Sequence, residues 1–153
     1  MKSFHLLAFS GAVVAMLSGL PATVVQAATV TNEPIDTSGV QLEPQQQNGV
    51  TYLSGGIGLD ESRAILQTKG YNLHMTFSVG SANQYIPDVD VAIQNMQGSS
   101  VLKLSQVGPI VYVQLPPGKY LVVTARSGQE KRSDVEVKSG AVRDLQFHWS
   151  DSY

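Results

Sequence analysis

The chain has 153 residues, a formal net charge of −2 and no cysteine. This small negative net charge argues against a nucleic-acid-binding surface, which needs a concentrated basic face. The lack of cysteine excludes disulfide bonds and a lipid-modified cysteine, so we expect the stability of the protein to come from an apolar core.

The first 27 residues have the pattern of a cleavable secretory signal peptide. Lys2 gives a positive start, residues 6–20 are almost wholly apolar, and Val25 and Ala27 occupy the −3 and −1 positions of a signal peptidase site. The apolar run is too short to remain as a membrane span. We therefore expect a periplasmic or secreted protein that begins at Ala28 and has no membrane span after cleavage. The remaining length of about 126 residues suits one domain.

Residues 28–50 are predicted to form a disordered polar tail. They contain Pro34, Pro44 and the run Gln45-Gln46-Gln47, with few large apolar side chains. Such a segment buries too little apolar surface to offset the entropy lost on ordering. The folded domain is therefore expected to span residues 51–153.

A glycine-rich loop opens this domain. Gly55, Gly56 and Gly58 lie within four positions, which indicates backbone that turns tightly or approaches another surface closely. Aromatic residues provide large contact areas with a polar edge, and Tyr85 and Tyr112 are expected to lie on strand surfaces. These five residues are the candidates for a ligand-binding surface, with tight turns and ordinary packing as the alternative.

One short helix is expected over Asp60–Lys69. Asp60 is a suitable N-terminal cap, and Gly70 stands where a helix terminator belongs. The apolar stripe of this segment is narrow, so the helix must dock on a larger structure. We expect it to dock through Ile65 and Leu66.

From residue 71 onward, apolar and polar residues alternate with a period of two, as in half-buried strands. Gly- or Pro-containing turns separate these segments, and no helix-length segment lies between them, which excludes a βαβ arrangement. The pattern predicts an all-β fold, an antiparallel β-sandwich of about seven strands with one short N-terminal helix. The expected strands are 73–79, 89–94, 101–104, 110–115, 120–125, 135–137 and 145–149.

One strand-turn-strand unit resembles the L-P-P-G-x-Y-x-V signature of carboxypeptidase regulatory-like domains. It reads Leu115-Pro116-Pro117-Gly118-Lys119-Tyr120-Leu121-Val122. The run Ser54-Gly55-Gly56-Ile57-Gly58-Leu59-Asp60-Glu61, followed by Tyr71-Asn72-Leu73 and Phe77, is similar to a family of small exported proteobacterial proteins that carry this domain. The resemblance covers about Tyr52 to Trp149. It implies a transthyretin-like (prealbumin-like), Ig-like sandwich and no particular reaction.

Metal-binding candidates are limited to two carboxylates. Asp88 and Asp90 are spaced by two, so they share one face of a strand and are candidate calcium ligands together with loop carbonyls. No D-x-D-x-D-G loop accompanies them, and a solvated strand end is the alternative. No cofactor is expected.

Catalytic candidates are few. His74 and His148 are the two histidines after the signal peptide, and no G-x-S-x-G motif occurs. Hydroxyisourate hydrolases resemble this architecture but end in a Tyr-Arg-Gly-Ser type of tail, whereas this chain ends in Trp149-Ser150-Asp151-Ser152-Tyr153. We therefore expect a non-catalytic periplasmic binding or accessory module. Its partner would be an envelope protein, a peptide or an envelope glycan, not a nucleic acid. The alternative is a small periplasmic hydrolase or metal-dependent enzyme on a transthyretin-like fold.

Overall fold

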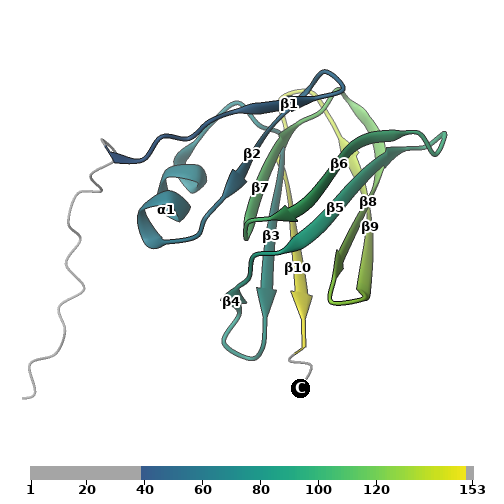
Figure 1. The fold of residues 1–153 in the computed structure, drawn as a ribbon. Helices are drawn as coiled ribbons and strands as arrows, with labels where there is room; N and C mark the ends of the chain where they lie inside the picture. Colours follow the sequence, from purple (N-terminus) through teal and green to yellow (C-terminus); the bar gives the residue numbers. More distant parts are fainter. Residues whose placement is uncertain (1–38, 151–153) are drawn as a thin grey trace, which may run out of the picture. The chain divides into compact units, whose positions relative to one another are not determined.

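The computed structural model describes residues 39–150; the predicted signal peptide, its cleavage site and residues 28–38 lie outside the described residues. Within this range the chain forms one helix and ten strands (Figure 1). No helix in residues 39–150 is long and apolar enough to cross a membrane. The elements are β1 (Gln45–Gln47), β2 (Val50–Gly55), α1 (Leu59–Gln67), β3 (Leu73–Val79), β4 (Gln84–Tyr85), β5 (Val89–Asn95), β6 (Ser100–Val107), β7 (Ile110–Gln114), β8 (Gly118–Arg126), β9 (Gln129–Val137) and β10 (Arg143–Trp149).

The strands form two sheets in a sandwich-like arrangement, so the all-β prediction with a single short helix is confirmed at this level. The first sheet has the order β1-β2-β7-β3-β10, with β4 also paired to β3, and the second has the order β6-β5-β8-β9. The expectation of purely antiparallel pairing is wrong, because β10 pairs with β3 in parallel. After β9 the chain passes from the second sheet to the first. There β10 runs in the same direction as its neighbour β3.

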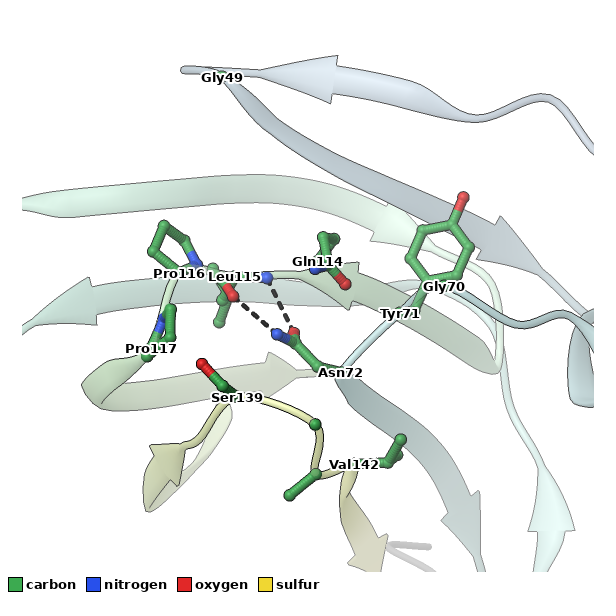
Figure 2. Close-up of a pocket in the computed structure, with 12 residues that line it drawn as sticks. Gly49, Gly70, Tyr71, Asn72, Gln114, Leu115, Pro116, Pro117, Ser139 and Val142 are labelled. Carbon is green, nitrogen blue, oxygen red and sulfur yellow. Dashed lines mark hydrogen bonds between the residues drawn. The ribbon is translucent and has the colours of Figure 1, made fainter.

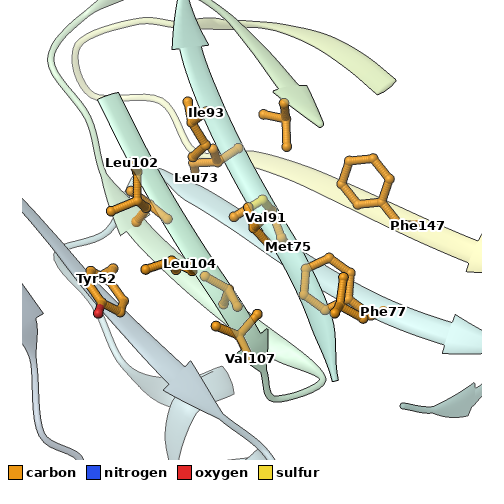
Figure 3. Close-up of a cluster of buried hydrophobic side chains, with 14 of the residues drawn as sticks. Tyr52, Leu73, Met75, Phe77, Val91, Ile93, Leu102, Leu104, Val107 and Phe147 are labelled. Atoms are coloured by element: carbon orange, nitrogen blue, oxygen red, sulfur yellow. The ribbon is translucent and has the colours of Figure 1, made fainter. Parts of the chain in front are cut away.

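The two sheets enclose the main core, to which both contribute alternate side chains (Figure 3). Leu73, Met75 and Phe77 of β3 are fully buried on this face. At the chain's last strand, Phe147 is buried and Trp149 is only 2% exposed, so the prediction that β10 belongs to the core is confirmed. Period-two alternation therefore identifies the core-facing residues of the strands correctly.

Each of the seven expected strands has a counterpart in the structure, and β1, β2 and β4 are additional. The prediction of a polar tail up to residue 50 is wrong for Gln45–Gln47, which pair antiparallel with β2 as β1, and for Val50, which begins β2 and is buried in the main core. Three glutamines have no intrinsic preference for a strand. Their conformation comes from backbone hydrogen bonding to the neighbouring strand, which a pattern of residue types does not reveal.

The helix begins and ends differently from the prediction. Gly58 occupies the N-cap position, no side chain caps the helix there, and the helix ends at Gln67, before Gly70. The expectation that Asp60 caps the helix is therefore wrong. Instead, Ser62 in the first turn of the helix contacts the backbone that precedes it. Its hydroxyl lies 2.7 Å from the carbonyl oxygens of both Gly56 and Gly58.

The helix lies on the outer face of the first sheet, away from the main core. Ile65 is 0% exposed, and with Leu53, Ile110 and Tyr112 it forms a small apolar layer that we call the outer cluster. Leu66 is 49% exposed, so only one of the two expected docking residues is buried. Consecutive residues of an α-helix are about 100° apart around its axis. When Ile65 faces the sheet, the next residue, Leu66, therefore points away from the sheet.

Candidate functional site

A groove of about 690 Å³ lies at one end of the sandwich, where four connections meet (Figure 2). They are the β1–β2 turn, the α1–β3 connection, the β7–β8 turn and the β9–β10 connection. The lining residues are Gly49, Gly70, Tyr71, Asn72, Gln114, Leu115, Pro116, Pro117, Ser139, Gly140, Ala141 and Val142. Loops held on a rigid scaffold are a common position for binding sites, so this groove is the first candidate.

Asn72 fixes the floor of the groove. Its side-chain Nδ2 donates to the Leu115 carbonyl at 2.7 Å, and its Oδ1 accepts from the Leu115 N–H at 2.9 Å (Figure 2). Its backbone N–H donates to the Val113 carbonyl, and its carbonyl accepts from the Arg143 N–H. One residue thus connects the end of β7 and the start of β10 to the start of β3, which holds the groove in a defined shape.

None of the residues that line the groove is charged. The two prolines, Val142 and the ring of Tyr71 offer apolar surface, whereas Gln114 and Ser139 offer an amide and a hydroxyl. The Tyr71 phenol is a neutral hydrogen-bonding group at physiological pH because the ordinary pKa of tyrosine is 10.0, and burial raises the pKa of Tyr71 further. This combination suits an uncharged ligand with both apolar and hydrogen-bonding surface.

A second cluster of polar side chains lies on the outer face of the first sheet, beside the outer cluster. Because β3 and β10 are in register, His74 stands next to Asp144, with Nδ1 and Oδ1 3.1 Å apart. The His74 ring also stacks on Tyr112, with a centroid separation of 3.6 Å and an interplanar angle of 6°. The Nε2 atom of His74 is buried and has no hydrogen-bond partner among the described residues.

The same two strands bring together a second pair, Ser78 and His148, whose Oγ and Nδ1 atoms are 3.1 Å apart. A Ser-His-Asp triad requires one histidine to contact both the hydroxyl and the carboxylate. Here Asp144 contacts His74, whereas Ser78 contacts His148, and these pairs stand four residues apart along β3 and β10. Four strand residues span about 13 Å, so the described residues form two separate pairs and not one triad.

The structure packs two of the three candidate glycines, Gly55 and Gly56, closely, whereas Gly58 is exposed and has no atom within 4 Å of where its Cβ would lie. A Cβ atom at Gly55 would lie 2.6 Å from Glu61 Oε1, and one at Gly56 would lie 3.0 Å from the Ile110 side chain. Glu61 Oε2 accepts hydrogen bonds of 3.0 Å from the N–H groups of Gly56 and Ile57. The close approach indicated by the glycines is therefore to α1 and β7 within the same chain.

The two candidate tyrosines differ in exposure. Tyr112 is 3% exposed, so the expectation that it offers a surface for ligands is wrong. Tyr112 does lie on the face opposite the main core, as alternation requires, but this face is covered by α1 and by the stacked His74. Tyr85 is 45% exposed on β4 and remains accessible, outside the residues that line the groove.

The two candidate calcium ligands lie at the start of β5. Both carboxylates are on exposed residues, and Asp90 Oδ1 accepts a hydrogen bond of 2.9 Å from the Gln106 N–H. This bond bridges the irregular pairing between β5 and β6. In residues 39–150 no three His, Cys, Asp or Glu side chains come together in a way that would hold a metal ion.

Comparison with known proteins adds no assignment: no family model matches the chain, and no curated protein matches it either. The sequence placed Tyr71 at the start of the alternating region and indicated a turn at Pro116-Pro117-Gly118, but it did not connect them. Their convergence at one end of the sandwich depends on the crossings between the sheets.

Proposed function

We propose that the chain is a non-catalytic binding module of the periplasm. Its groove would hold an uncharged segment of an envelope protein, peptide or glycan. The observation that carries this proposal is the groove of about 690 Å³ with its uncharged, mixed apolar and polar lining. The signal-peptide pattern of residues 1–27 supports export to the periplasm.

A finer assignment of the fold belongs to the same proposal. The Leu115-to-Val122 signature and the two-sheet arrangement support a transthyretin-like sandwich of the carboxypeptidase regulatory-like type. Such a fold does not define a reaction, because one fold hosts unrelated activities. The groove, and not the fold, therefore supports the proposed binding function.

The groove is tested by NMR titration of the ¹⁵N-labelled mature protein with two uncharged probes. One is an oligomer of N-acetylglucosamine, a neutral glycan, and the other is an uncharged peptide rich in proline and alanine. Shifts at Tyr71, Gln114 and Ser139 that saturate with one probe are expected, and the responding probe identifies the ligand class. The absence of shifts with both probes, or shifts confined to other surfaces, would contradict the proposal.

A matched pair of variants separates binding in the groove from binding elsewhere. Ala141→Trp fills the groove with a large ring and is expected to abolish the titration. Met96→Trp adds the same ring at an exposed residue of the β5–β6 turn and is expected to leave the titration unchanged. Equal behaviour of the two variants would show that the groove is not the binding site.

The alternative proposal is a small hydrolase, for which the Asp144–His74 and Ser78–His148 pairs are the supporting observation. Each pair contains a histidine with only one of the two partners that a Ser-His-Asp triad requires. We favour binding because the two pairs are separated along the strands. We expect no turnover of 5-hydroxyisourate or of ester and peptide substrates by the purified protein. Turnover in the wild type that disappears in a His74→Ala, His148→Ala double variant would establish the enzyme instead.

A further inference from the structure

The edge strands on the two lateral sides of the sandwich differ in whether other groups of the chain cover their outer backbone hydrogen-bonding groups. On one side the Gln47 side chain occupies the edge of β6, because its Oε1 accepts from the Lys103 N–H at 2.6 Å and its Nε2 donates to the Lys103 carbonyl at 3.0 Å. A side-chain amide thus replaces a neighbouring strand at that edge. On the opposite side β10 ends the first sheet and β9 ends the second.

The backbone of β10 offers hydrogen bonds at this free edge. The Arg143 N–H donates to the Asn72 carbonyl, and the Trp149 carbonyl accepts from the Gly80 N–H, so the odd-numbered residues of β10 bond to β3. In a strand, successive residues direct their N–H and C=O groups to opposite sides. The N–H and C=O groups of Asp144, Gln146 and His148 therefore point toward the free edge.

The sequence of β10 is complementary to itself in the antiparallel direction. When two copies pair about Gln146, the outward-bonding residues meet as Asp144 opposite His148 and Gln146 opposite Gln146. A carboxylate then faces an imidazole on both sides of a central amide pair. Between them Leu145 stands opposite Phe147, which matches apolar with apolar residues.

There is room for a second strand at this edge. An open space of about 470 Å³ lies between Leu145–His148 of β10 and Lys131–Ser133 of β9. The two basic side chains that border it are already engaged within the chain. Arg132 is 2.6 Å from Glu130, and Lys131 lies over the Trp149 ring at 5.8 Å. Neither cation therefore faces the entering strand as a free charge.

We propose that the chain forms a two-fold symmetric dimer in which β10 of one copy pairs antiparallel with β10 of a second copy, centred on Gln146. The occupant of this edge is a second copy, because Asp144, Leu145 and Gln146 each meet a complementary residue when the partner carries the same sequence. The first sheets of the two copies become one continuous sheet. Such an isologous interface is closed and leaves no further β10 edge exposed.

The dimer is tested first by cross-linking, for which the chain is well suited because it has no cysteine. Gln146→Cys places two thiols opposite each other in a hydrogen-bonded pair, whose Cα separation of about 5.5 Å lies within the range of disulfides. Asp134→Cys, on the edge strand of the second sheet, is the matched control. We expect a covalent dimer of Gln146→Cys under mild oxidation and a monomer of Asp134→Cys on non-reducing gels.

A second measurement, sedimentation of the mature protein, does not depend on a new covalent bond. The wild type is expected to sediment as a dimer, and Gln146→Lys to weaken it about tenfold or more, because two like charges then meet on the symmetry axis. Gln97→Lys, which adds the same charge at an exposed turn, is expected to leave the dimer intact. A monomeric wild type would overturn the proposal. So would a dimer that resists Gln146→Lys and does not cross-link through Cys at position 146.

Discussion

The first sheet carries apolar side chains on both of its faces, but different numbers of elements cover the two faces. The main core on the inner face combines side chains from most strands of both sheets. The outer cluster of Leu53, Ile65, Ile110 and Tyr112 depends on one nine-residue helix. An isolated helix of this length is not stable in water. The difference predicts that the main core determines global folding, whereas the outer cluster opens locally.

The largest effect is expected from removing β10. Truncation after Gly140 deletes Phe147 and Trp149, each of which contributes about 3–5 kcal/mol by the usual cost of losing a buried aromatic side chain. Small domains have a total stability of only about 5–15 kcal/mol. We expect the truncated chain to show no cooperative melting by circular dichroism. A melting transition equal to that of the full chain would contradict the importance given to the main core.

A smaller, local effect is expected from Ile65→Ala. The substitution removes the only side chain through which α1 enters the outer cluster, and the usual loss for a fully buried isoleucine is about 2–5 kcal/mol. Hydrogen exchange is expected to accelerate in α1 while β8 and β9 stay protected. Equal acceleration in both regions would show that the two apolar layers unfold as one.

Glu61→Gln tests the link between the helix and the glycine-rich loop. The Glu61 carboxylate accepts from both Gly56 and Ile57, and loss of its charge weakens both hydrogen bonds, with an expected destabilisation of about 1–2 kcal/mol. Urea unfolding measures this change. Asp60→Asn, at the exposed neighbouring position, is the control and is expected to change the unfolding midpoint much less.

Alkaline pH is expected to destabilise the protein, and Tyr112 contributes to this sensitivity. Burial, and then the nearby Asp144 and Tyr85, raise the pKa of Tyr112 above the ordinary 10.0. The folded state therefore favours the neutral phenol. The stability from this group is complete below about pH 10 and falls as the pH rises further, because the unfolded chain loses its proton first. Urea midpoints measured across this range should fall less steeply for Tyr112→Phe than for the wild type.

The smallest effect is expected from Leu66→Asp, next to Ile65 on the same helix. Leu66 is on the exposed side of α1, so the free energy of unfolding should change by no more than about 0.5 kcal/mol. A decrease in the free energy of unfolding comparable with that of Ile65→Ala would show that the exposed side of α1 is covered in solution.

The sequence by itself determined which residues face the main core and where the chain turns. Alternation correctly assigned Leu145, Phe147 and Trp149 to one face, because strand geometry places every second side chain on the same side. It also placed Tyr112 correctly on the opposite face. These are local properties of the backbone, and they follow from residue types over a few positions.

Only the tertiary structure decided what covers the outward faces and which strands are neighbours. Tyr112 is buried because α1 and His74 lie over it, and His74 meets Asp144 across 70 residues of chain. The groove likewise exists because four turns from different parts of the chain meet at one end of the sandwich. Periodicity carries no information on strand order, because the contacts that select it join residues far apart in sequence.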